Sequence, residues 1–145
     1  MDFNKKEIEF WFPNLVGKSF EIFDVEGDFN CVAFTLEIYN DWLWTNSPEW
    51  PYQEIPRNSG LNGFIKLYEK HGYIKCTNSD YEEGYEKIAF YSKNNLPQHA
   101  AKQFGNIWKS KLGCRVIIEH ELEWLCGNTE DAYGTIAFIM KRIKR

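Results

Sequence analysis

The sequence lacks the short motifs of common metal, redox and nucleotide sites. None of its four cysteines form a C-x-x-C pair, which disfavours a zinc knuckle or a thioredoxin-like centre. Neither a GxGxxG or P-loop pattern nor an H-E-x-x-H motif occurs, so nucleotide and zincin sites are not indicated. We therefore expect no cofactor and no metal, with a His120–Glu119 metal contact as the one open alternative.

The sequence also shows no recognisable targeting segment, and it has fewer basic residues than acidic ones. The N-terminus, MDFNKKEIEFWF, has charges where a signal peptide is apolar, and no run approaches the roughly 18 apolar residues of a membrane span. These absences predict a cytoplasmic protein with reduced thiols and no membrane contact. The net charge of -4 disfavours nucleic-acid binding, because neutralising phosphates needs a basic surface.

Aromatic residues, by contrast, are abundant. Phe, Tyr and Trp make up 17 % of the 145 residues, in a composition that is 43 % hydrophobic and 26 % charged. These fractions are typical of a globular protein, and the length predicts a single domain, 1–145, with its own core. Side chains of this size favour a large core or an aromatic groove.

The first half of the chain predicts helices and an irregular loop. Asn30 is a capping residue before an apolar run, so a buried helix of about ten residues is expected from Cys31. Residues 42–58 contain three Trp and three Pro, and this proline density predicts an ordered aromatic loop without regular elements. The segment LNGFIKLYEKHG then predicts a helix that ends at Gly72.

The last third of the chain predicts an antiparallel sheet. Strand candidates are EKIAFYS, QHAAKQF, IWKSKL and YGTIAFIMKR, and VIIEHELEWLCG is expected to move into a short helix. Gly105 and Asn106 fit a two-residue hairpin turn, which would pair Phe104 with Ile107. Helices first and sheet second indicate an α+β fold.

Cys31 and His99 are the pair of residues best suited to nucleophilic catalysis. A thiol at a helix start lies near the positive end of the dipole, which lowers its pKa, and Cys31 has that position. A histidine beside it would lower the pKa further and relay a proton, and His99 is flanked by small residues that would let a helix approach. Taken alone, however, a Cys in an apolar helix is more often core, and a single strand His is more often structural.

A third group should orient the imidazole in such a site. The hairpin register places Ser110 on the same face as His99, as its diagonal neighbour. Glu119 and His120 remain open as alternatives, since the chain after the hairpin is free to fold back.

The aromatic loop follows the Cys31 helix by only a few residues, so it should emerge near the same site. We therefore expect Trp44 or Trp50 to line a substrate cleft. The prolines make the loop stiff, and a stiff aromatic wall loses little entropy when it holds a ligand. Packing of these rings in the core is the equally weighted alternative.

Cys31 at a helix start, the strand KIAFYS, a turn and QHAAKQF together resemble the core of NlpC-type and CHAP-type cysteine amidases and peptidases. These enzymes belong to the papain-like superfamily. The chain also resembles a larger, poorly characterised bacterial family through FNCVAF, DWLWTNSPEWP, EKIAFY, QHAAKQF, WKSKLG, IIEH and AYG, over about residues 29 to 134. The resemblance implies a papain-like core in which N-terminal helices pack on an antiparallel sheet.

The resemblance also implies roles for individual residues. Cys31 would be the nucleophile and His99 the general base, with Asn30 or the Cys31 backbone N–H stabilising an oxyanion. At the third position, where NlpC-type enzymes usually have His, Asn or Gln, this sequence has Ser110.

Two functional classes follow. The first is a cysteine hydrolase, an amidase, peptidase or acyl-transfer enzyme, whose substrate is an amide-containing peptide, protein or metabolite. The second is a catalytically inactive papain-like fold that serves as a protein-binding or immunity-type module, with a structural Cys31. The pKa of the Cys31 thiol distinguishes the two classes.

Overall fold

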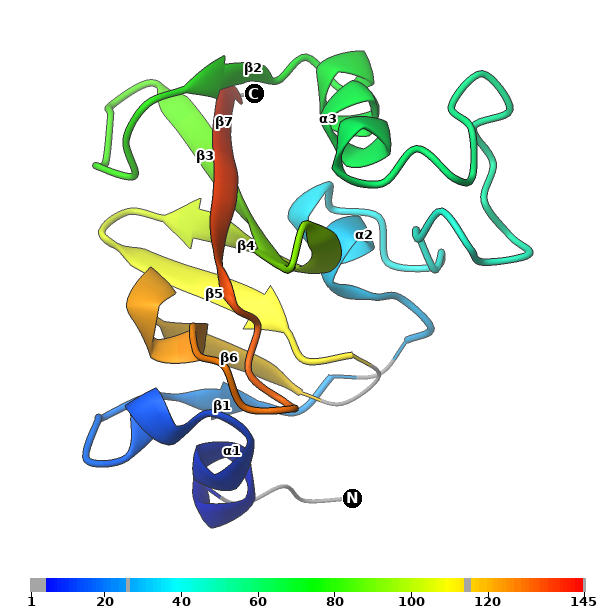
Figure 1. The fold of residues 1–145 in the computed structure, drawn as a ribbon. Helices are drawn as coiled ribbons and strands as arrows, with labels where there is room; N and C mark the ends of the chain where they lie inside the picture. Colours follow the sequence, from blue (N-terminus) through cyan, green and yellow to red (C-terminus); the bar gives the residue numbers. More distant parts are fainter. Residues whose placement is uncertain (1–4, 26, 114–115, 145) are drawn as a thin grey trace.

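Antiparallel strands form a seven-stranded sheet in the computed structural model, which describes residues 5–25, 27–113 and 116–144 (Figure 1). The strand order across the sheet is β1-β6-β5-β4-β3-β7-β2. The strands are β1 (Ile22–Phe23), β2 (Ile74–Cys76), β3 (Tyr85–Lys93), β4 (Leu96–Phe104), β5 (Ile107–Lys111), β6 (Ile117–His120) and β7 (Thr135–Ile143). The three nine-residue strands, β4, β3 and β7, are neighbours in this order.

Both faces of the sheet are covered, which explains why β3 and β4 are buried along most of their length instead of alternating between buried and exposed residues. The face covered by α2 (Cys31–Thr35) and α3 (Leu61–Lys70) is called here the α2 face, and it includes Ile88, Phe90 and Ala100. The opposite face is called the α1 face, and it includes Ala89, Tyr91 and Ala101.

The α1 face is covered by three short helical segments. These are α1 (Lys5–Trp11), the 3-10 helix η1 (Pro13–Leu15) and the 3-10 helix η2 (Leu122–Leu125). Each segment contributes apolar side chains to the core on this side of the sheet, including Ile8, Leu15 and Leu125. The sheet therefore separates two apolar cores, one on each face.

The expected papain-like α+β fold is wrong. Helices make up 21 % of the structure, in short segments, and the sheet is the dominant element. The helix that begins at Cys31 ends after five residues, and Glu37 then turns the chain with a positive φ of 60°. The N-terminal helices do not form one layer on the sheet, because α1 and α2 pack on opposite faces.

Several local predictions are confirmed. The β4–β5 hairpin pairs Phe104 with Ile107, as its two-residue turn required. Helix α3 ends at Lys70, and Gly72 follows with a φ of 90°, a conformation that glycine adopts without steric cost. The proline-rich loop 42–58 contains no helix or strand.

Within the described ranges, none of the helices combines the length and the apolar character of a membrane span.

Candidate functional site

Asn30 begins the helix that carries Cys31, and both the oxygen and the nitrogen of its side-chain amide form hydrogen bonds within the fold. Its Oδ1 accepts hydrogen bonds from the backbone N–H groups of Ala33 and Leu43, both at 3.1 Å. Its Nδ2 donates to the Leu43 carbonyl at 2.9 Å. Asn30 therefore caps α2 and ties the following loop to it. The side chain that was predicted to stabilise an oxyanion therefore has a structural role in the cap and the loop.

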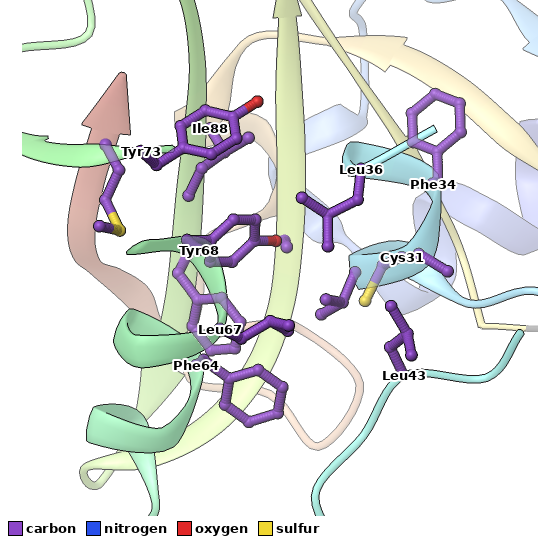
Figure 2. Close-up of a cluster of buried hydrophobic side chains, with 14 of the residues drawn as sticks. Cys31, Phe34, Leu36, Leu43, Phe64, Leu67, Tyr68, Tyr73 and Ile88 are labelled. Carbon is purple, nitrogen blue, oxygen red and sulfur yellow. The ribbon is translucent and has the colours of Figure 1, made fainter. Parts of the chain in front are cut away.

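Cys31 is part of the apolar core on the α2 face. Only 6 % of the residue is exposed, and Figure 2 shows its sulfur within the cluster that includes Leu43 and side chains of α3. Burial raises the pKa of the Cys31 thiol to about 11, although hydrogen bonding with the backbone of Ala100 and Val32 and the charge of Lys111 act to lower it. Desolvation outweighs the helix start that was expected to activate this thiol.

His99 lies in the core on the α1 face. Its imidazole stacks on the ring of Tyr133, with centroids 4.1 Å apart and planes 13° apart, and it also contacts Tyr91. Burial and the nearby His120 hold the pKa of His99 well below its usual value. The Nε2 atom is buried and has no hydrogen-bond partner among the described residues. The imidazole is therefore neutral at physiological pH.

Cys31 and His99 do not form the expected pair. Successive residues of a strand point to opposite faces, and Cys31 packs with Ala100 on the α2 face. The preceding residue, His99, packs with Tyr91 and Tyr133 on the α1 face. The thiol and the imidazole thus face opposite sides of β4, and the imidazole is not directed at the thiol.

Ser110 and His120 form a buried pair of their own. The Ser110 hydroxyl donates to Nε2 of His120 at 2.8 Å, and Nδ1–H of His120 donates to the Glu121 carbonyl at 3.0 Å, which fixes the tautomer because a carbonyl only accepts. Both side chains are fully buried, and burial lowers the pKa of His120 to about 4. Glu119, the other alternative, forms a half-buried ion pair with Lys109.

Trp44 and Trp50 pack on the core instead of standing free in a groove. Trp50 is 6 % exposed and donates its indole N–H to the Ile55 carbonyl. The ring of Trp44 lies 4.7 Å from the ring of Phe64 and 6.2 Å from that of Phe90, measured between centroids. These contacts match the packing alternative for both rings.

A pocket of about 470 Å³ lies elsewhere, and the aromatic loop reaches it through Trp42. It is called here the aromatic pocket, and it is bounded by Trp11, Phe12, Trp42, Tyr133, Glu130 and Asp131. The loop was predicted to line a cleft through Trp44 or Trp50, whereas Trp42 is the tryptophan of this loop that lines the pocket. Tyr133 lies in the AYG motif, and no local signal in either segment shows that the two residues line the same pocket.

A metal centre finds no support in the described residues. Over the described ranges, no group of three or more His, Cys, Asp or Glu side chains converges as a metal ion would require. The neighbours Glu119 and His120 are committed to other partners, since Glu119 pairs with Lys109 and His120 bonds to Ser110.

Comparison with known proteins gives a family but no relative of known activity. None of the curated proteins and none of the solved structures matches the chain. A family model described as "Domain of unknown function (DUF7689)" matches residues 24–141, which include α2, the aromatic loop and nearly the whole sheet. Because the match spans most of the sequence, the chain belongs to this family.

Proposed function

We propose that this protein is a protein-binding module in which Cys31 is structural, and that the aromatic pocket is its recognition site. The observation that carries the proposal is the environment of Cys31, a thiol buried in an apolar core with its pKa raised to about 11. A nucleophilic cysteine needs the opposite, a partly exposed thiol with a lowered pKa.

A cysteine hydrolase is the less well supported alternative. Its mechanism needs a base that takes the thiol proton, but His99 faces the other side of β4 and its pKa is well below the usual value. Ser110 bonds to His120 instead of orienting His99. An amide substrate would also have to reach a sulfur that the core covers.

The positive support comes from the aromatic pocket. Its volume of about 470 Å³ lies within the range of ligand sites, about 300–1,000 Å³. Trp42 is half-buried at this pocket and belongs to neither of the two apolar cores formed by the described residues. A large ring that lines a pocket without packing in a core is suited to contact a partner.

Alkylation of the folded protein tests the non-catalytic role. Iodoacetamide is added near neutral pH, and the labelled cysteines are identified by peptide mass spectrometry. Cys31 should react more slowly than Cys76, which is half-exposed, because both burial and a raised pKa protect it. Denatured protein is the control, and there the two thiols should react at similar rates. Preferential labelling of Cys31 in the folded protein would favour the hydrolase.

A further inference from the structure

We propose that a second pocket, which shares no lining residue with the aromatic pocket, binds a single sugar unit. It is called here the polar pocket, and its volume is about 230 Å³. The loop between β2 and β3, the β4–β5 hairpin and the start of η2 surround it, and Figure 1 shows these three segments on the same side of the molecule. This site goes beyond the proposed function and does not depend on it.

The inner side of the polar pocket presents one free donor and one free acceptor. Gln103 of β4 and Trp108 of β5 pair directly, so their side chains share a face of the sheet, and they are 8 % and 5 % exposed. Nε2 of Gln103 donates to the Ser79 carbonyl at 2.7 Å. Within the described chain, neither Oε1 of Gln103 nor the indole N–H of Trp108 has a hydrogen-bond partner, and neither is fully enclosed. A ligand in the pocket is therefore their route to a partner.

This donor and acceptor select the chemistry of the ligand. A hydroxyl group satisfies both, because it donates one hydrogen bond and accepts others. An ammonium or guanidinium group only donates, so it would leave the Trp108 N–H without an acceptor. An ionised carboxylate or phosphate only accepts, so it would leave Oε1 of Gln103 without a donor. A buried polar atom left without a partner costs free energy, which disfavours both kinds of ion.

Three carboxylates at the rim call for further hydroxyl groups. Asp80, Glu121 and Glu123 line the pocket and are exposed. Among the described residues, none of the three carboxylates forms an ion pair or a hydrogen bond. An ionised carboxylate only accepts, so each needs a donor from the ligand. A sugar carries hydroxyls on neighbouring carbons and supplies several donors at once, whereas a simple alcohol or an amide supplies too few.

Tyr81 adds an aromatic face beside these acids. It lines the pocket and is 44 % exposed, and its ring stacks on no other ring of the described chain. The ring of a tyrosine offers a flat apolar surface, which suits the C–H face of a sugar ring while the hydroxyls reach the polar groups. The volume of about 230 Å³ is below the range of about 300–1,000 Å³ for drug-sized ligands, so the pocket fits one sugar unit.

The walls of the polar pocket are already held in place. The buried ammonium of Lys87 donates to the carbonyl of Asn78 at 3.2 Å and to its Oδ1 at 3.1 Å, which ties down the β2–β3 loop next to Ser79. On the other side, the Tyr91 hydroxyl donates to the Leu122 carbonyl at 2.8 Å and anchors the start of η2. A site that is ordered before binding loses less entropy when a ligand arrives.

Nuclear magnetic resonance on the full chain tests the proposal through the tryptophan indole N–H signals. The probes are the methyl glycosides of glucose, galactose, mannose, N-acetylglucosamine and arabinose. At least one should shift the signal of Trp108 in a saturable way, with a Kd on the order of 1 mM for a ligand of this size. The signal of Trp50, whose N–H is bonded to the Ile55 carbonyl, should not shift. Methylammonium, acetate and N-methylacetamide are the controls for cations, anions and amides.

Variants at the rim locate the contacts. Asp80→Ala and Glu121→Ala should each weaken the glycoside about tenfold, because each removes a charged acceptor, and Asp80→Asn should lose less. Tyr81→Leu keeps an apolar side chain but removes the flat ring, and it should also weaken binding. Glu83→Ala, an exposed acid of the same loop outside the pocket lining, is the matched control and should change nothing. All these residues are exposed, and thermal unfolding checks that each variant is folded.

A disaccharide that ends in the sugar of the best glycoside distinguishes two sources of the ligand. Binding within about threefold of the methyl glycoside would assign the end of a glycan, and loss of binding would assign a free monosaccharide. Both results support recognition of a sugar unit.

Three outcomes would overturn the inference. No shift of the Trp108 signal with any glycoside would contradict a sugar site. Tighter binding of methylammonium, acetate or N-methylacetamide than of every glycoside would contradict recognition of hydroxyls. Equal weakening in Glu83→Ala and Asp80→Ala would contradict binding in the polar pocket. None of these results bears on the alkylation of Cys31, so the inference and the proposed function fail separately.

Discussion

The rings of His99 and Tyr133 stack with their planes 13° apart and their centroids 4.1 Å apart. The contact joins a neutral, fully buried imidazole to a ring that lines the aromatic pocket. Protonation of His99 would therefore place a charge in the core directly against a ring that lines the pocket.

The protein should lose stability as the pH falls from about 6.5 towards 4. The pKa values of His99 and His120 are lower in the folded chain than their usual value, so the unfolded chain binds their protons more tightly. The stability that depends on these two histidines being neutral is fully present above about pH 6.5, and it is lost as the pH falls and the histidines of the unfolded chain take up protons. His120 alone, with its pKa lowered from 6.5 to about 4, accounts for about 3 kcal/mol. Urea unfolding at a series of pH values measures how steeply the free energy of unfolding depends on pH.

Replacement of His99 tests whether the buried histidines cause this pH dependence of stability. His99→Phe removes a titrating group whose Nε2 has no hydrogen-bond partner within the described part of the chain, so the free energy of unfolding should depend less steeply on pH in this range. Tyr133→Phe, which keeps the stacked ring, should leave the slope unchanged. An unaltered slope in His99→Phe would mean that His99 is not the buried neutral group described here.

Trp50 and Trp42 should respond differently to truncation, although both belong to the same loop. Trp50→Ala removes a buried ring from the core and its hydrogen bond to Ile55, and it should cost about 3–5 kcal/mol. Trp42→Ala should cost much less, because this half-buried ring lies outside both cores. Denaturant unfolding compares them, and similar losses would show that Trp42 is also a core residue.

Asn30 should contribute to stability as a cap. Asn30→Ala removes the acceptor for Ala33 and leaves both backbone groups of Leu43 without their partner, so we expect a loss of about 2–3 kcal/mol. Asn30→Ser keeps a capping oxygen but cannot reach both groups of Leu43, and its loss should be intermediate. Urea unfolding measures the loss of stability in the two variants. A loss in Asn30→Ala below about 0.5 kcal/mol, the level of an ordinary surface substitution, would argue against a capping role for Asn30.

Local sequence signals predicted some elements well and others poorly: the helix from Cys31 has half its expected length, and the segment from Val116 begins with strand β6 before its short helix. The two-residue turn at Gly105 and Asn106 determines the register of the hairpin, so the pairing of Phe104 with Ile107 follows from the chain alone. The end of α3 near Gly72 was equally predictable, because glycine readily takes the positive φ found there. Both features depend on residues that are close in sequence.

The arrangement of these elements was not predictable in the same way. Alternation along β4 shows that His99 and Ala100 face opposite sides, but not which side α2 will cover. The sequence also gave no reason to place β7 between β3 and β2, an order that depends on long-range pairing. A helix start suggested an activated Cys31, whereas its pKa depends on burial by distant segments such as α3.

The pKa of the Cys31 thiol tests the central claim most directly. It is measured from the ultraviolet absorbance of the thiolate during a pH titration, in a variant with Cys76, Cys114 and Cys126 replaced by serine. The same protein with Cys31→Ser provides the baseline. A structural, buried thiol predicts titration at about 11, above the ordinary value for cysteine. Titration near neutral pH would contradict this account and indicate a thiolate nucleophile.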